Sequence, residues 1–325
     1  MTIRALHPDE FDEHAGLVFV SYTHEREIAE GSMLADPNWW LRSMERDPFY
    51  EPAQTRVMHL DGRLVASVTC YLRPTWVAGR QMKAACIGSV CTHPDYRRRG
   101  LVRQVLDEAA AWMTAEGFEC SFLYGKYEVY GGSGWQNLSS WDTIANLRLR
   151  EDVGENVTLR PADPDADLPL LMRIHEAFSG RLTGPTVRTE DYWRTRVLAP
   201  TPWGPAPTYD IAEQAGEPVG YVCASGASVR EIGWLDRPHE LLAAVMARIT
   251  DGPVHFGFSL PELTAALRDI SAIPTQQQCF REPGGIELRE AYRGLWRSHA
   301  TEADTDALVR TMRDRDYLMW PADRA

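Results

Sequence analysis

The spacing of apolar and polar residues over the first 150 positions predicts an alternation of strands and helices. Runs with a period of two predict strands, at 2–6, 55–60, 64–73, 82–91, 119–125 and 138–149. Helical character extends over 9–46, and a second helix begins at Leu101 and ends before Gly117. Its apolar positions have helical spacing: Leu101, Val102, Val105, Leu106, Ala109 and Met113. This order predicts an α/β (α+β) fold with a mixed, mostly antiparallel sheet flanked by helices.

A pattern from the N-terminus recurs in the middle of the chain. The segment "MTIRALHPDEFDE" at 1–13 is echoed by "VTLRPADPDADLP" at 157–169, 156 residues later. The strand–turn–strand pattern "HLDGRLVASVTCY" at 59–71 is echoed by "AEQAGEPVGYVCAS" at 212–225. Two similar pairs of segments, separated by nearly the same number of residues, indicate two copies of one fold. The alternative is chance similarity of short strand-and-turn patterns. With a polar, glycine-containing boundary near 150–157, we predict domains at 1–152 and 153–325.

Composition and charge exclude several classes of protein. The 325 residues carry a formal net charge of -12, and no apolar run approaches the ~20 residues of a membrane span. The six cysteines form no CxxC pair, so we expect no metal site, no disulfide framework and a cytoplasmic location without a signal peptide. An acidic chain disfavours nucleic acid and would attract a cationic substrate, although a solubilising surface is the more common reason for such a charge.

One short stretch concentrates positive charge in this acidic chain. In "CTHPDYRRRGLVRQ", three arginines and Gly100 lie between a predicted strand and a predicted helix. The start of a helix leaves backbone N–H groups unpaired, and the helix dipole adds positive charge there. Glycine lets the backbone approach a ligand closely, and arginines suit phosphates. The stretch therefore predicts an anion site at the start of the helix.

The same residues resemble a known family. "VCTHPDYRRRGLV" is similar to the signature of the GCN5-related N-acetyltransferases, in which a strand precedes x-P-x-[YF]-R-x-[RK]-G-[LIV]-[GA]; Val102 departs from the usual glycine or alanine. The resemblance implies acetyl-CoA as co-substrate, with its pyrophosphate on the loop amides. It also implies that the strand splays from 119–125, so that its backbone pairs with pantetheine and an N–H near Val90 stabilises the oxyanion. The implied cofactor-binding residues are Val90, Cys91, Thr92, Arg97, Arg98, Arg99, Gly100, Leu101, Val102 and Arg103.

A second segment narrows the resemblance. "YGKYEVYGGSGWQN" is similar to a segment of the bacterial tandem acetyltransferases of the enhanced-intracellular-survival type. The resemblance implies that Tyr130 is the general acid that protonates the leaving CoA thiolate. It also implies the terminal carboxylate, here Ala325, as the base. Glu25 and Glu128 are other candidates for the base, only because they lie near the motifs in the sequence. A tyrosine hydroxyl is protonated at neutral pH, which is compatible with the acid role.

The second copy lacks the anion site. Its corresponding segment, "GWLDRPHELLAAVMAR", keeps the helix but has only Arg237, followed by Pro238. We therefore expect the second copy to shape the acceptor pocket or an interface between copies of the chain. Mycothiol synthase, another tandem acetyltransferase, works through its C-terminal half and fits less well.

The sequence thus predicts transfer of an acetyl group to a primary amine, on a small molecule or a peptide, by direct attack. Two alternatives stay open. One is a CoA-binding sensor or interaction module without catalysis, and the other is a mycothiol-synthase-like acetyltransferase of small molecules. A covalent route through Cys91 is less favoured, because a strand cysteine usually only packs.

Overall fold

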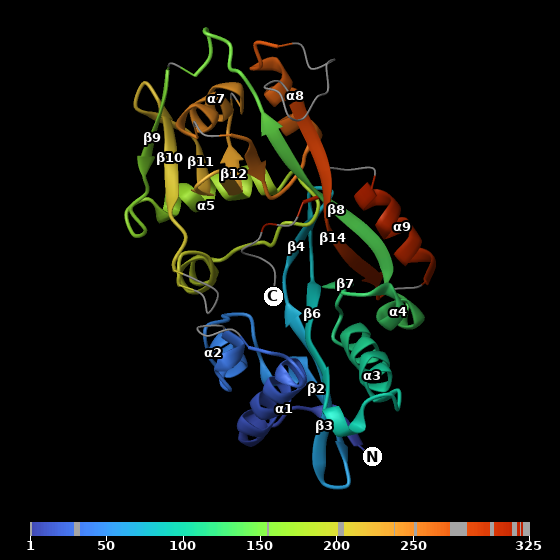
Figure 1. The fold of residues 1–325 in the computed structure, drawn as a ribbon. Helices are drawn as coiled ribbons and strands as arrows, with labels where there is room; N and C mark the ends of the chain where they lie inside the picture. The colour runs from blue at the N-terminus through green and yellow to red at the C-terminus, as the bar shows by residue number, and fades with distance from the viewer. Residues whose placement is uncertain are drawn as a thin grey trace.

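The computed structural model describes residues 2–28, 33–154, 156–200, 205–236, 238–249, 252–273, 285–299, 302–313, 317, 318 and 320. Twelve strands form one continuous sheet in the order β1-β2-β3-β6-β7-β14-β8-β13-β12-β11-β10-β9, and helices cover both of its faces (Figure 1). Only the β6–β7 and β12–β13 pairs are parallel among these neighbours. The predicted fold class, a mixed and mostly antiparallel sheet flanked by helices, is confirmed. No described helix combines the length and apolar character of a membrane span.

The elements before residue 150 follow the predicted order. The strands are β1 (Thr2–Ala5), β2 (Thr55–Leu60), β3 (Arg63–Leu72), β4 (Thr75–Val77), β5 (Arg80–Met82), β6 (Ala84–Thr92), β7 (Cys120–Tyr124) and β8 (Gln136–Asn146). The α-helices are α1 (Phe11–Thr23), α2 (Trp39–Glu45), α3 (Leu101–Ala115) and α4 (Tyr127–Tyr130). The β4–β5 hairpin, which forms a separate two-stranded sheet, was not predicted.

The elements after residue 156 repeat much of this order. The strands are β9 (Val157–Pro161), β10 (Tyr209–Gln214), β11 (Glu217–Ser225), β12 (Ser228–Trp234), β13 (Val254–Phe256) and β14 (Gly285–Ser298). The helices are α5 (Leu168–Ser179), α6 (Glu190–Tyr192), which continues as a π-helical turn over Trp193–Val197, α7 (Pro238–Arg248), α8 (Pro261–Asp269) and α9 (Glu302–Arg313).

Three local features recur at matching places in the two parts. Asp61–Gly62 between β2 and β3, and Ala215–Gly216 between β10 and β11, all have positive φ, as the tight turns of twisted hairpins require. The pairing register of each hairpin shifts two residues before the end of its first strand. The shift lies at Met58/His59 in β2 and at Ala212/Glu213 in β10. In each part an arginine of the first strand is bound by a carboxylate at the start of the first helix, Arg4 by Glu10 and Arg160 by Asp167.

Strand β14 lies between β7 and β8, far from its neighbours in sequence (Figure 1). Its C-terminal part pairs with β7 from Gly294↔Tyr124 to Ser298↔Cys120. Its other edge pairs with β8 from Gly285↔Asn146 to Trp296↔Gln136. A strand from the last fifth of the chain thus completes the sheet of the first part. The predicted boundary at residue 152 would assign β14 to the second part, although its partners β7 and β8 belong to the first.

The sheet separates the core of the first part into two layers. One layer packs α3 on the sheet and includes Val105, Leu123 and Leu295. The opposite layer packs α1 and α2 on the sheet and includes Trp40 and Trp296. Because successive strand residues face opposite sides, Leu295 and Trp296 of β14 contribute one side chain to each layer.

A buried ion pair lies in the second part, under β11 and β12. The Arg188 guanidinium donates two hydrogen bonds to the Glu231 carboxylate, at 2.8 and 2.9 Å, and both side chains are almost fully buried. The Tyr221 hydroxyl donates to the same carboxylate at 2.7 Å. Although burial opposes ionisation, Arg188 and His175 hold the pKa of Glu231 below its usual range. The carboxylate is therefore charged and depends on these partners.

Removing this carboxylate should destabilise the protein, because Arg188 would remain buried without its counter-charge. We expect Glu231→Gln to lower the free energy of unfolding by about 3–5 kcal/mol, measured from urea denaturation followed by tryptophan fluorescence. Arg194, which is 42% exposed and pairs with Glu190, provides the control, and Arg194→Gln should cost at most about 1 kcal/mol. Equal losses in the two variants would contradict the interpretation.

Candidate active site

Strand β6 leaves its parallel neighbour halfway along its length. Its ladder with β7 runs from Ala84↔Cys120 to Ile87↔Leu123, whereas β6 itself continues to Thr92. On its other edge β6 stays paired with β3 as far as Ala66↔Thr92. Within 84–92 and 120–124, the β7-facing edge of β6 beyond Ile87 therefore has no ladder partner. The family resemblance implied a splayed strand here, with the backbone of Val90, Cys91 and Thr92 free to bind an extended ligand.

The divergence coincides with a bulge in β6. The register with β3 shifts between Ser67 and Thr69, and the bulged residue Ser89 has φ 47°, a conformation that non-glycine residues rarely adopt. Gly88 is required beside it, because a Cβ there would lie 2.7 Å from the Tyr71 ring. The bend in the strand is thus built into the sequence at Gly88–Ser89.

Buried side chains hold the bulge in place. The Tyr71 hydroxyl is 2.7 Å from Ser89 Oγ and accepts a hydrogen bond from Trp40 Nε1. The Ser67 hydroxyl donates to the Ser89 carbonyl at 3.2 Å, and His14 Nε2 lies 2.9 Å from Ser67 Oγ. Sequence reasoning did not identify these residues. The alternation of Ser67, Thr69 and Tyr71 along an otherwise apolar strand was the available signal, since it places polar groups on one face.

The loop after β6 leads into an open helix start. His93 caps the 3₁₀ turn Pro94–Tyr96 by accepting from the Asp95 N–H. Arg98 and Gly100 have φ of 62° and 70°, so Gly100 is required by backbone conformation as well as by any close approach. A Cβ at Gly100 would meet nothing within 4 Å, and no side chain caps α3. The first N–H groups of this 15-residue helix are thus available to an anion.

The predicted arginines have different surroundings. Arg97 donates to the Ser21 carbonyl at 2.9 Å and fastens the loop to α1, and Arg103 donates to the Gly132 carbonyl at 2.8 Å. Arg98 and Arg99 are exposed, and the Arg99 guanidinium lies 5.4 Å from the Tyr96 ring. All four side chains are exposed, but those of Arg97 and Arg103 are held by backbone carbonyls of other elements.

The two apolar residues at the helix start also pack inward. Leu101 is buried in the α3 core layer, and Val102 packs against it. Their backbone N–H groups are thus the only means by which these two predicted residues could bind a phosphate.

Tyr130 ends α4 and lies against the chain just after β7. A Cβ at Gly125 would be 2.4 Å from its ring, so Gly125 makes room for it. Tyr130 and Val90 both pack on the α3 core layer. Tyr22 on α1 is close enough to Cys91 and Tyr130 that, besides burial, charges on these two residues would raise its pKa. Burial raises the pKa of Tyr130, so its hydroxyl is protonated at neutral pH. The structure thus brings Tyr130 to the region where β6 and β7 diverge.

None of the candidates for the base is buried among the described residues. Glu25 and Glu128 are exposed, and Glu25 pairs with His24 at 3.3 Å. Ala325 lies outside the residues that the structure describes, as does Arg237 of the second part.

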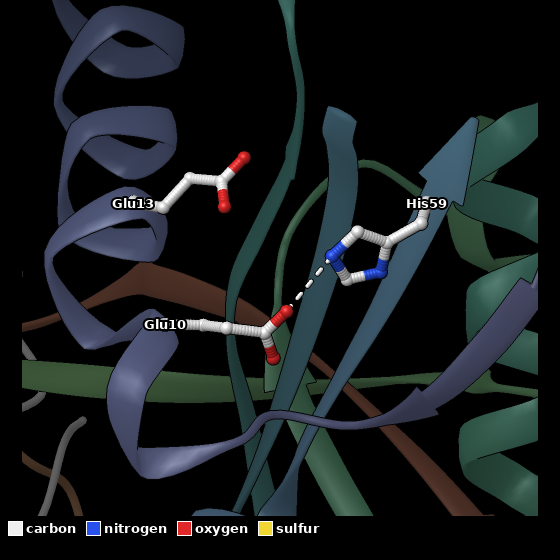
Figure 2. Close-up of side chains that lie close together, drawn as sticks. All are labelled: Glu10, Glu13 and His59. Carbon is white, nitrogen blue, oxygen red and sulfur yellow. Dashed lines mark ion pairs between the residues drawn. The ribbon is translucent and has the colours of Figure 1, made fainter. Parts of the chain in front are cut away.

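The described residues contain one cluster with the side chains of a metal site. Glu10, Glu13 and His59 each place a ligand atom within 4.8 Å of the others. Figure 2 draws the three side chains, with the Glu10–His59 ion pair dashed. Arg4, however, donates to both oxygens of Glu10, and Glu13 accepts from the Leu64 N–H. Because these carboxylates already serve the fold and a guanidinium lies beside them, we assign no metal here.

Comparison with known proteins agrees with the geometry. Residues 2–138 match the family model of the acetyltransferase (GNAT) domain. An uncharacterised N-acetyltransferase of Streptomyces griseus is 29% identical over 150 residues, which cover 42% of this chain and 36% of that relative. The chain thus spans little more than a third of the curated relative it matches.

Solved structures share the fold across most of the chain. A probable N-acyltransferase from Enterococcus faecalis has a TM-score of 0.68 at 14% identity, covering 92% of this chain and 72% of that one. Eis1 from Mycobacterium abscessus has a TM-score of 0.63 at 16% identity, covering 93% and 75%. These structures share the fold of this chain, and the family model places the likeness to a GNAT acetyltransferase domain in residues 2–138. The predicted resemblance to the GNAT acetyltransferases, which generally use acetyl-CoA, is confirmed for that part of the chain.

Cys91 should behave as an inert thiol. Burial raises its pKa to about 11, so only about one part in a thousand is thiolate at pH 8. We expect the Cys91 peptide to remain unmodified when the native protein is treated with iodoacetamide at pH 8, and to be modified in urea, as read by mass spectrometry. Rapid labelling of the native protein would instead support a covalent route through this residue.

Proposed function

We propose that the protein is an acetyl-CoA-dependent N-acetyltransferase whose working site lies in residues 1–152. The observation that carries the proposal is the continuous path from the unpaired edge of β6 to the uncapped start of α3. The unpaired backbone after Ile87 can bind an extended chain with amide groups, as an added strand does. The N–H groups after Gly100 can bind the pyrophosphate at its end, with Arg98 and Arg99 nearby.

The proposed reaction is direct attack of a primary amine on the thioester. The amine nitrogen bonds to the carbonyl carbon and loses its proton to a base or to water, and the C–S bond breaks. A backbone N–H near Val90 stabilises the developing oxyanion, and the Tyr130 hydroxyl gives its proton to the departing thiolate. Holding both substrates against one strand supplies rate through proximity. The net charge of -12 favours a cationic amine as acceptor.

We further propose that residues 153–325 form a second, degenerate copy of the same fold. The recurring turns, register shifts and Arg–carboxylate pairs support this division. In the second copy, β12 likewise pairs with its parallel neighbour β13 over only two residues, Ser228 and Val229, but it carries the buried Glu231. Pro238 at the start of α7 has no N–H to offer.

Removal of the Tyr130 hydroxyl tests the acid role. Tyr130→Phe should lower kcat by about 10²–10⁴-fold, because the thiolate must then leave unprotonated. Free thiol released from acetyl-CoA with a panel of amines measures the rate. Tyr127→Phe is the matched control on the same helix, since Tyr127 is 49% exposed, and it should leave kcat unchanged. An unchanged kcat in Tyr130→Phe would refute the acid role, and a wild-type protein that binds CoA without releasing thiol would support a binding module.

Substitution of Gly100 tests the pyrophosphate site. Gly100→Asp adds a negative charge at the helix start and strains a residue with φ 70°, so we expect a more than tenfold loss of CoA affinity by calorimetry. Gly62→Asp is the control, because Gly62 has φ 77° in equally open space in the β2–β3 turn. It should produce a similar loss of stability with unchanged CoA affinity. Retained CoA affinity in Gly100→Asp would exclude this loop as the site.

A further inference from the structure

The segment Tyr130–Trp135, here called the tyrosine loop, is tied to α3 on one side. The Arg103 guanidinium donates to the Gly132 carbonyl at 2.8 Å. The Ser133 hydroxyl donates to Asp107 Oδ1 at 2.7 Å. Both partners belong to the helix whose start forms the proposed pyrophosphate site, so this contact links the loop to that site.

The other side of the loop is held by β14, from the end of the chain. The Arg297 guanidinium donates to the Ser133 carbonyl and lies over the Trp135 ring, 5.1 Å from its centroid. Ser133 and Trp135 are both buried, and Gly134 between them has φ 89°. A planar guanidinium can form both contacts at once, because it stacks on an aromatic face while its edge donates hydrogen bonds.

The sheet fixes where Arg297 lies. Its residue is paired with Ser121 of β7, and the preceding residue, Trp296, is paired with Gln136 of β8. The strands β7 and β8, which flank the tyrosine loop, therefore both pair with β14 at or next to Arg297. Ser121 also accepts a hydrogen bond from Trp135 Nε1 at 3.1 Å, so the loop and β14 meet on one strand.

Tyr130 depends on this arrangement for its position. Its hydroxyl has no hydrogen bond to any part of the chain that the structure describes, and its ring is located by packing against Gly125. Its backbone begins the 3₁₀ turn Gly131–Ser133, whose last carbonyl is the one that Arg297 binds. A shift of that carbonyl would move the turn and with it the tyrosine ring.

We propose that Arg297 is a positioning residue for Tyr130, supplied to the site of the first part by a strand from the second. The inference rests on the proposed acetyl transfer. It gives the second part a task in the reaction, because without β14 the tyrosine loop loses the contacts of Arg297 with Ser133 and Trp135.

Arg297→Gln tests the proposal, with Arg289→Gln as the control on the same strand. Arg289 is 60% exposed and contacts Glu287, so its variant should resemble wild type. In Arg297→Gln we expect kcat to fall about 10- to 100-fold, because a displaced acid is poorly aligned, and the KM for acetyl-CoA to change less than about twofold. Arg297→Lys keeps a charged donor but loses the stacking, so its kcat should lie between the two.

A double variant separates positioning from general damage. In a Tyr130→Phe background, Arg297→Gln should change kcat less than about twofold, because the group that it positions is already gone. An equal loss in both backgrounds, or an unchanged kcat in Arg297→Gln, would overturn the inference while leaving the proposed function intact. If Arg297→Gln does not fold, Arg297→Lys is used in the same comparison.

Hydrogen exchange gives a readout without activity. Amides in the peptide 126–136 should exchange faster in Arg297→Gln than in wild type or Arg289→Gln. Unchanged exchange would overturn the inference. A wild-type protein with no acetyl-transfer activity but the expected exchange would instead overturn the proposed function and leave the structural role of Arg297 standing.

Discussion

Backbone pairing of β14 with both β7 and β8 is the interaction on which the rest of the structure depends. Without it, β7 and β8 would be two open edges, and the sheet would fall into separate halves. The same strand contributes Leu295 to the α3 core layer and Trp296 to the opposite layer. It also carries Arg297 to the tyrosine loop. Sheet continuity, core packing and the proposed site thus share one element.

The two parts of the chain differ in the chemistry beside their central strands. In the first part, a bulge at Ser89 is held by neutral hydroxyl groups, which leaves the backbone of β6 bent away from β7. In the second part, the core beside β12 holds a charged pair, Arg188 with Glu231, within a cluster of aromatic rings. A buried ion pair requires every partner to be in place, so this region suits a rigid scaffold better than a site that admits a ligand.

The sequence predicted what is determined locally. Strand and helix periods, the Asp61–Gly62 turn and the helix after Gly100 depend on neighbouring residues, and each lies within a few residues of its predicted place. The insertion of β14 depends on pairing between segments far apart in the sequence, which periodicity does not encode. The hydrogen-bond partner of Arg97 could not be predicted either, because the Ser21 carbonyl lies on α1, far from Arg97 in the sequence. Arginines that seemed alike in the sequence therefore have different tasks.

The position of β14 also has a consequence for the order of events during synthesis. The strands β7 and β8 leave the ribosome early, but the strand that joins them comes about 140 residues later, or roughly 7–30 s at ordinary elongation rates. Until then the edges of β7 and β8 that β14 covers are unpaired, and such edges are prone to associate with other chains. The nascent chain is thus expected to need protection by a chaperone during this interval, and a premature stop before β14 would leave a permanently incomplete sheet.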